Sequence, residues 1–235
     1  MIKAFGTAVT TVALLAATAA AQAGTLTMGG WLFGSGNAVS VSTPTYSGQA
    51  GGFKGNLSGM TDSRFNINPV EMYCVDLAES INISSGVSYS VKMAGEAGTT
   101  DFTLVSVASL FSSAVAARLT ELVSYAEAVS TRVDTSGEST SLQLAIWNTL
   151  YDTDASLDNG TFKDTSSFRT YANTLLTASA GAAATKDLYV LRSVGNPGKQ
   201  DQLIWVNKVP EPGTLALVAL AACGLGAVRR RRRAG

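Results

Sequence analysis

The most reactive side chain in this sequence is a thiol. The chain of 235 residues contains two cysteines, Cys74 and Cys223, and no histidine. Without histidine, neither Ser-His-Asp nor Cys-His catalysis can operate, and a zinc site built on imidazole is excluded. Cys223 lies in an apolar stretch and counts as a small apolar residue. Cys74 is therefore the one thiol of the main body, and in an oxidising compartment it is a liability unless it is buried, paired between molecules or chemically committed.

Cys74 belongs to one of two short motifs that together resemble a known family. It follows Tyr73 and is separated from Asp76 by one aliphatic residue. Far along the chain, Gln143 begins a Gln-x-x-Ile-Trp segment that ends at Trp147. An aromatic-Cys-aliphatic-Asp strand and an aliphatic-Gln-x-x-aliphatic-Trp helix resemble the two signatures of bacterial surface thioester domains.

The resemblance implies a covalent chemistry. In that family the cysteine sulfur is joined to the glutamine side-chain carbonyl with release of ammonia, and a lysine amine or sugar hydroxyl then attacks the thioester. Carried over, Cys74 is the thiolate that forms the bond and later leaves, and Gln143 is the acyl group that ends on the target. Tyr73 and Asp76 surround the bond. Trp147, one helical turn after Gln143, shields it from water.

Other interpretations of these residues stay open at this point. Cys74 fits equally a buried thiol on a core strand, and Gln143 and Trp147 fit residues that merely pack on a helix. The segment that begins at Gln200 resembles the closing strand of the same family. Its Gln200 and Gln202 are the alternative acyl partners.

A polar loop offers a second, weaker grouping. Oxygen donors alternate at Asp152, Asp154 and Asp158, and Asn159-Gly160 follows. This spacing is typical of a calcium loop, but Lys163 stands at the twelfth position, where a bidentate Glu is needed. We therefore expect a polar loop after a helix, with no metal site and no other cofactor. A calcium-dependent or glycan-processing secreted enzyme is the least favoured function, and no enzymatic activity is expected.

The charges are segregated along the chain. Lys and Arg total 17 and Asp and Glu total 17, but five of the basic residues form one run near the C-terminus. Between Gly24 and Lys208 there are eleven basic and sixteen acidic residues, a net charge of −5. A nucleic-acid binder needs a basic face to neutralise phosphates, so this body argues against one.

The N-terminus is typical of a secretory signal peptide over residues 1–23. Lys3 provides a short basic region, an Ala-rich apolar stretch follows, and Ala21 and Ala23 form an A-x-A cleavage pattern. The alternative is an N-terminal membrane anchor, which the small residues and interspersed threonines disfavour. We expect the mature chain to begin at Gly24, beyond the cytoplasmic membrane.

Residues 209–235 combine a rigid segment, an apolar run and a basic end. Pro210, Glu211 and Pro212 precede an apolar stretch at 214–228, which is about 22 Å long as a helix. This stretch predicts a single transmembrane helix with local thinning of the bilayer. The arginines that follow are Arg229, Arg230, Arg231, Arg232 and Arg233. Because such a run resists translocation, it acts as a stop-transfer signal and leaves the body outside; the alternative is a core helix with a solvated basic end.

This three-part arrangement closely resembles the PEP-CTERM sorting signal of Gram-negative bacteria. The resemblance implies recognition by an exosortase, a membrane protease-transferase, through Pro210, Glu211 and Pro212. It also implies that the membrane helix is removed during delivery to the cell surface or exopolysaccharide matrix. Two prolines suit this role, because they hold the segment extended and outside the helix.

The body, residues 24–208, is expected to be one α+β domain. Alternating runs bounded by Gly, Asn and Pro predict strands. The predicted strands lie at 25–28, 31–33, 39–42, 52–57, 73–77, 87–91, 187–192 and 201–206. Apolar spacing of three and four predicts helices at 102–129, broken near Ser112-Ser113, at 139–150, and at 164–180 with a cap at Asp164 or Thr165. The order predicts an antiparallel sheet or sandwich with an inserted helical segment.

The sequence thus predicts an exported cell-surface or biofilm-matrix protein that is sorted by its C-terminal signal. Its partners are an exosortase, the membrane before processing, and a surface polysaccharide or another ligand bearing an amine or hydroxyl. Through Cys74 and Gln143 it is expected to act as a covalent adhesin. The alternative is a purely structural matrix component without thioester chemistry.

Overall fold

The computed structural model describes residues 23–152, 154–195 and 198–209. The predicted signal peptide up to residue 22, the Pro-Glu-Pro segment, the membrane helix at 214–228 and the arginine run lie outside these ranges. Inside them, no helix has the length and apolar character needed to cross a membrane.

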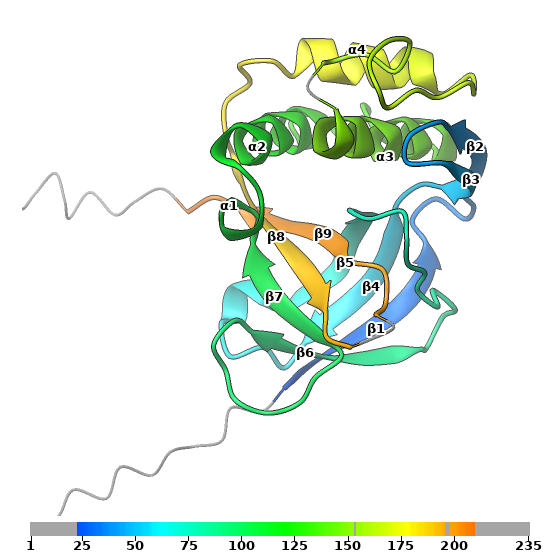
Figure 1. Cartoon of the computed structure of the whole chain (residues 1–235). Helices are drawn as coiled ribbons and strands as arrows, with labels where there is room; N and C mark the ends of the chain where they lie inside the picture. The colour runs from blue at the N-terminus through cyan, green and yellow to red at the C-terminus, as the bar shows by residue number, and fades with distance from the viewer. Residues whose placement is uncertain (1–22, 153, 196–197, 210–235) are drawn as a thin grey trace, which may run out of the picture.

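The body is built on a closed barrel of seven strands, with helices across one end (Figure 1). The strands are β1 (Gly24–Trp31), β4 (Phe53–Ser58), β5 (Ile67–Cys74), β6 (Ser88–Met93), β7 (Phe102–Ser106), β8 (Lys186–Ser193) and β9 (Gln202–Asn207). Their order around the barrel is β1-β4-β5-β9-β8-β7-β6, and β1 also pairs with β6. The mostly β body is confirmed, and all neighbouring barrel strands except β6 and β7 pair antiparallel, but the predicted sandwich is wrong.

The barrel and the sandwich share the same sequence pattern, which explains this error. Both bury alternate residues of each strand, and closure depends on pairings between strands that are distant in sequence. Gly55 in β4 shows how closely the strands pack. A Cβ atom at Gly55 would lie 2.7 Å from the carbonyl oxygen of Thr27 in β1.

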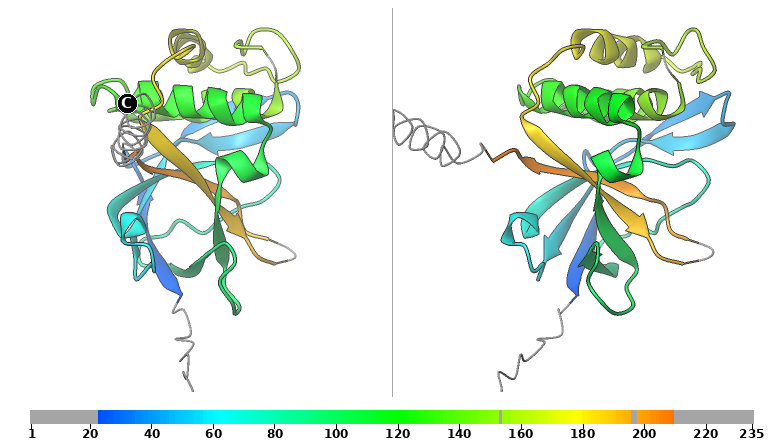
Figure 2. Two further views of the ribbon diagram at one scale, coloured as in Figure 1. Left: turned by 90° about the vertical axis from the view of Figure 1, so that its left-hand side faces the viewer. Right: turned by 60° about the vertical axis from the view of Figure 1, so that its left-hand side comes forward.

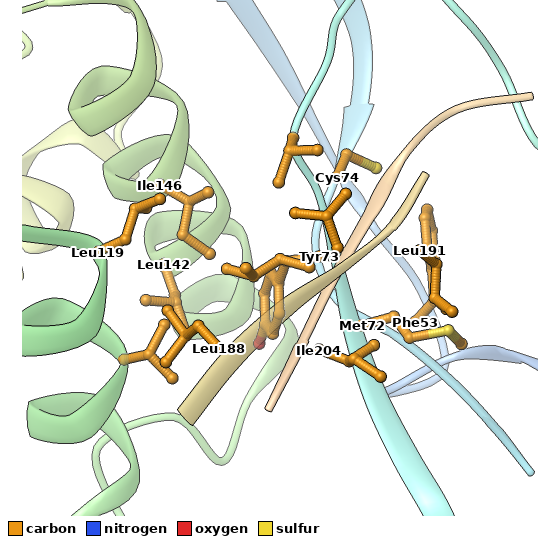
Figure 3. Packing of buried hydrophobic residues seen from close by; sticks show 14 of the residues in the cluster. Phe53, Met72, Tyr73, Cys74, Leu119, Leu142, Ile146, Leu188, Leu191 and Ile204 are labelled. Atoms are coloured by element: carbon orange, nitrogen blue, oxygen red, sulfur yellow. The ribbon is translucent and has the colours of Figure 1, made fainter. Parts of the chain in front are cut away.

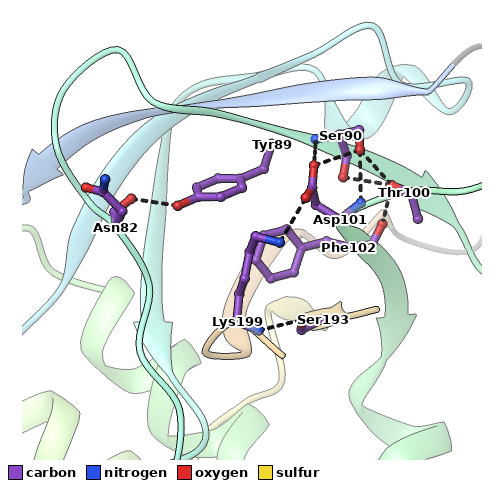
Figure 4. A network of polar contacts seen from close by, with 8 residues as sticks. All are labelled: Asn82, Tyr89, Ser90, Thr100, Asp101, Phe102, Ser193 and Lys199. Carbon is purple, nitrogen blue, oxygen red and sulfur yellow. Dashed lines mark hydrogen bonds and ion pairs between the residues drawn. The ribbon is translucent and has the colours of Figure 1, made fainter. Parts of the chain in front are cut away.

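β6 and β7 form the parallel pair of the barrel, and Asp101 ties them together beside the start of β7 (Figure 4). Its carboxylate accepts hydrogen bonds from the backbone N–H and the hydroxyl of Ser90, at 2.8 and 2.9 Å, and Lys199 Nζ lies 2.9 Å from its other oxygen. Partial burial opposes ionisation, but the bonds from Ser90 and Lys199 outweigh it and lower the pKa of Asp101.

A separate hairpin projects from the barrel beside the helices (Figure 1). It consists of β2 (Asn37–Val41) and β3 (Tyr46–Ala50), which pair antiparallel. The sequence predicted β2 but not β3, whose Ser, Gly and Gln residues give no strand signal. Two further strand predictions change. The strand predicted at 25–28 is part of β1, which runs on to Trp31, so of the strand predicted at 31–33 only Trp31 is in a strand and residues 32 and 33 lie in a turn. The strand predicted at 73–77 is the end of β5, which stops at Cys74.

The helices lie between β7 and β8 in sequence, which confirms the inserted helical segment. They are α1 (Val107–Leu110), α2 (Ser113–Glu127), α3 (Ser136–Tyr151) and α4 (Arg169–Ala178), and a 3-10 turn spans Ser63–Phe65. The break at Ser112 is confirmed, and its hydroxyl accepts a hydrogen bond from Val115 N. The helix predicted from residue 102 is wrong at its start. Phe102 and Leu104 are buried at alternate positions of β7. Two or three apolar residues are too few for their spacing to distinguish a strand from the first turn of a helix.

The predicted cap of the last helix is also wrong. Helix α4 starts at Arg169, and its N-cap position, Phe168, makes no side-chain cap. Asp164 is instead buried, and its carboxylate accepts hydrogen bonds from Ser40 N at 3.2 Å and Ser166 N at 2.9 Å. Asp164 thus joins the hairpin to the loop before α4, and Thr165 N donates to Ser40 O in the same contact.

Helix α3 is the central element of the helical end. It lies with α2 between the barrel and α4, as the two further views confirm (Figure 2). Every residue from Ser139 to Thr149 is buried. Because α3 is covered both by the barrel and by α4, its polar residues lie in the interior as well as its apolar ones.

Candidate functional site

Two adjacent residues of β5 are tied to two residues one turn apart on α3. The Tyr73 hydroxyl lies 3.1 Å from the Ser139 hydroxyl, which also accepts a hydrogen bond from Gly52 N at 2.8 Å. At the next residue of β5, the side chain of Gln143 bonds the backbone of Cys74. Because Tyr73 and Cys74 are consecutive in the strand and Ser139 and Gln143 lie one turn apart on the helix, this pair of contacts fixes both the position and the direction of α3.

The apolar core supports this junction. Tyr73 is fully buried and stacks on Trp205, with ring centroids 5.9 Å apart. Leu142 and Ile146 from α3 lie on the side of β5 toward which the tyrosine extends, and Cys74 extends in a different direction (Figure 3). Tyr73 therefore positions the helix against the strand. The structure gives it this packing role next to the predicted site, with a pKa that burial raises.

The carboxamide of Gln143 is held on the peptide group of Cys74. Gln143 Oε1 accepts a hydrogen bond from Cys74 N, and Gln143 Nε2 donates one to Cys74 O, both at 2.8 Å. Gln143 is 0% exposed, so both bonds are shielded from water. The two residues that the sequence singled out are thus brought together. The Cys74 N–H already points at the oxygen on which negative charge would develop if a nucleophile attacked the carboxamide.

The thiol of Cys74 is buried and has one polar neighbour from β9. Gln202 Nε2 lies 3.8 Å from Cys74 Sγ, and the two residues are paired in the β5–β9 register. Burial raises the pKa of the Cys74 thiol, the hydrogen bond from Gln202 lowers it, and the nearby charge of Asp76 raises it further. Burial dominates, so the thiol is protonated in the folded protein.

Gln202 was expected only as an alternative acyl partner, and its position beside the Cys74 thiol was not predicted. It is 0% exposed, and its Nε2 also donates to Gln200 O at 3.1 Å. Its Oε1 is buried without a hydrogen-bond partner among the described residues. A glutamine on a mostly apolar strand was the available signal, but its place beside the thiol depends on the pairing of β9 with the neighbouring strand β5.

Asp76 lies outside the strand and secures the loop that follows Cys74. One carboxylate oxygen accepts a hydrogen bond from Glu79 N at 3.1 Å and the other from Asp201 N at 2.6 Å. Gln200 Nε2 donates to Asp76 O at 3.1 Å. Asp76 therefore joins the loop after β5 to the start of β9, which places Gln202 beside the thiol.

The same contacts collect three carboxylates where no metal site was expected. Asp76, Glu79 and Asp201 offer oxygen atoms that all lie within 4.8 Å of one another. Burial raises the pKa of both Asp76 and Asp201, and the neighbouring carboxylates add to the shift against opposing backbone hydrogen bonds. Since these oxygens already accept backbone N–H groups, the cluster serves the connection between the two segments.

Trp147 lies one turn beyond Gln143 and is 1% exposed. Its ring meets that of Tyr46 from β3 edge to face, with centroids 5.4 Å apart. Its indole N–H has no hydrogen-bond partner among the described residues. Tyr46, which the sequence did not indicate, therefore packs on the indole of Trp147, and shielding of the Cys74–Gln143 pair by Trp147 stays a prediction.

The Asp152–Asp158 loop keeps its carboxylates occupied by the protein itself. Asp152 accepts hydrogen bonds from the backbone N–H groups of Thr161 and Phe162. Asp158 forms an ion pair with Arg169 Nε at 3.0 Å and accepts a hydrogen bond from Asn173. The side chain of Asp158 is therefore directed toward α4, which agrees with the expected polar loop after a helix.

Comparison with known proteins identifies one segment. Residues 208–233 match the PEP-CTERM protein-sorting motif, which includes Pro210, Glu211, Pro212 and the arginine run to Arg233. No curated protein and no solved structure matches the chain. The motif implies a secreted protein that an exosortase processes and that reaches the cell surface.

Proposed function

We propose that this protein is a covalent surface adhesin whose reactive group is a thioester between Cys74 and Gln143. The observation that carries the proposal is the pair of 2.8 Å hydrogen bonds that hold the Gln143 carboxamide on the Cys74 peptide group. The PEP-CTERM motif supports delivery to the surface, where such a bond would meet its target.

Formation of the bond balances without an added reagent. The Cys74 sulfur attacks the Gln143 side-chain carbonyl carbon, and the oxygen takes negative charge beside the Cys74 N–H. The carbon–nitrogen bond then breaks, and ammonia leaves with the proton that the thiol gives up. The raised thiol pKa disfavours a free thiolate, but the product thioester is neutral, so burial favours it over separated charges.

Opening of the bond would attach the protein to its ligand. A lysine amine or sugar hydroxyl attacks the Gln143 carbonyl carbon, the carbon–sulfur bond breaks, and the nucleophile's proton passes to the Cys74 sulfur. The surface ligand then carries an amide or ester to Gln143. Because the thiol pKa is raised, the sulfur leaves in its protonated form.

Mass spectrometry of the exported protein tests the bond. The wild type should weigh about 17 Da less than its sequence mass between the same termini, because one ammonia is lost. Cys74→Ala should restore the full mass. The better partner variant is Gln143→Glu. Gln143→Ala would leave the buried Cys74 N–H and C=O unpaired, whereas a neutral glutamic acid can keep both hydrogen bonds.

The contrary outcomes separate two alternatives. A full-mass wild type whose Cys74 is alkylated once the protein is unfolded would leave the structural matrix protein as the function. Unfolding is needed, because burial alone would slow alkylation of a free thiol. A mass deficit that persists in Gln143→Glu would identify Gln202 as the acyl partner, since its amide also reaches the sulfur.

A further inference from the structure

We propose that Tyr46 closes the Cys74–Gln143 site and determines which nucleophiles reach it. This inference rests on the proposed thioester and adds the residue that selects its reaction partner by size. Tyr46 lies on β3 of the hairpin, outside the barrel and the helices that carry the other site residues.

Tyr46 covers the site through Trp147. The two rings meet edge to face at 5.4 Å, and Trp147 follows Gln143 by one turn of α3. Trp147 is 1% exposed and Tyr46 is half-buried, so the tyrosine is the layer between the indole and solvent. A nucleophile from this side must pass the tyrosine ring before it reaches the tryptophan and the acyl carbon.

The backbone of β3 is shaped to hold the ring in this place. Gly48 lies two residues beyond Tyr46 on the same side of the strand, and a Cβ atom there would come within 2.6 Å of the Tyr46 hydroxyl oxygen. The absent side chain lets the ring lie along the strand. The hydroxyl then donates a hydrogen bond to Gln49 O at 2.8 Å, which fixes the ring without using a group from the barrel.

The hairpin is anchored at its base to the helix that carries Gln143. Asn37 and Ala50 form its first residue pair, and both contact Thr140 of α3. Asn37 Nδ2 donates to Thr140 Oγ1 at 3.0 Å, and Thr140 Oγ1 donates to Ala50 O at 2.8 Å. The edge of β2 is joined to the loop before α4, and β3 is the outer strand. These contacts hold the base of the hairpin against the helix that carries Gln143.

The electrostatics agree with this placement. Burial raises the pKa of the Tyr46 phenol, and the neighbouring Cys74 adds to the shift. When an amine opens the thioester, it attacks the Gln143 carbonyl carbon, the carbon–sulfur bond breaks, and the amine's proton goes to Cys74. The Tyr46 phenol neither gives nor takes a proton in this reaction, and Tyr46 acts by blocking access to the acyl carbon.

The first test compares two amines on the exported protein. Methylamine and the larger Nα-acetyllysine are added, and the rate of adduct formation is followed by mass. Tyr46→Ala should raise the rate for Nα-acetyllysine relative to methylamine by about tenfold, because an aromatic contact no longer has to break. Tyr46→Phe keeps the ring and should leave the ratio unchanged. Gly48→Ala, which displaces the ring but keeps the phenol, should shift the ratio as Tyr46→Ala does.

A second test does not depend on the thioester. In the Gln143→Glu background Cys74 is a free thiol, and its alkylation by iodoacetamide in the folded protein reports access to the site. Adding Tyr46→Ala should speed this alkylation by about tenfold, and adding Tyr46→Phe should not. Equal alkylation rates with and without Tyr46→Ala would overturn the inference. If the wild type has its full sequence mass but Tyr46→Ala still speeds alkylation of Cys74, the thioester is rejected and the closure by Tyr46 is kept.

Discussion

The junction between β5 and α3 depends on the Ser139 hydroxyl, and its removal gives a sharp test of how the site is positioned. Ser139 Oγ accepts a hydrogen bond from Gly52 N at 2.8 Å and lies 3.1 Å from the Tyr73 hydroxyl, and all three residues are buried. Ser139→Ala would leave the Gly52 N–H and the Tyr73 O–H without partners. At about 1 to 3 kcal/mol for each of these two buried unpaired groups, the free energy of unfolding should fall by about 2 to 6 kcal/mol.

Tyr73→Phe is the matched comparison. It removes one partner of the Ser139 hydroxyl but leaves the bond from Gly52 N intact, so it should cost about 1 kcal/mol. Ser136→Ala, in the half-buried first turn of the same helix, should change stability by no more than about 0.5 kcal/mol.

Urea denaturation followed by far-UV circular dichroism measures these differences. We predict that Ser139→Ala loses the most stability, Tyr73→Phe less and Ser136→Ala the least. The dependence of the unfolding free energy on urea concentration should be similar in all three. The thioester mass deficit should also form more slowly in Ser139→Ala, since Gln143 lies one turn along the helix. A Ser139→Ala variant as stable as Tyr73→Phe would refute the idea that one hydroxyl joins the two segments.

Three further predictions concern the helix cap, the acidic cluster and processing. Thr135→Ala removes the capping box that Thr135 forms with Glu138 at the start of α3, and the free energy of unfolding should fall by about 1 kcal/mol in the same urea assay. Asp201→Asn keeps the acceptor for Ser193 N but removes a carboxylate whose pKa is raised above its ordinary value of 3.8. Because a raised folded pKa means that stability falls as pH rises above that value, the variant should lose less stability than the wild type between acid and neutral pH; an unchanged pH profile would count against it. Exported material should begin at Gly24 and lack the arginine run, and N-terminal sequencing or mass spectrometry that finds either end intact at the surface would contradict this.

Local sequence patterns predicted the elements but not their closure. The helices at 113–127 and 136–151 and most barrel strands follow from apolar spacing and from breaks at Ser, Gly and Asn. The barrel depends instead on pairings such as β1 with β6 and β5 with β9, which join segments far apart in sequence. Leu104 shows the limit of the pattern, because it lies two residues after Phe102, which fits a strand, and three residues before Val107, which fits a helix.

The candidate site was predictable in its residue types and less so in its surroundings. Cys74 and Gln143 were singled out by their motifs, and the structure brings them together through the register of α3 on β5. Gln202 was considered only as an alternative acyl partner and Tyr46 was assigned no role, because the contacts of β9 and of the hairpin with the site depend on the three-dimensional fold. The buried environment of α3 was missed for the same reason, since its polar residues look exposed until the barrel and α4 cover them.

Peptide mapping after methylamine treatment tests the central claim most directly. The exported protein is incubated with methylamine, unfolded, alkylated and digested, and the peptides that contain Cys74 and Gln143 are identified by tandem mass spectrometry. The account predicts a methylamide on Gln143, about 14 Da heavier than the unmodified side chain, and an alkylated Cys74 in the same sample, whereas without methylamine Cys74 resists alkylation. An unmodified Gln143 together with a Cys74 that is alkylated equally well with and without methylamine would contradict it.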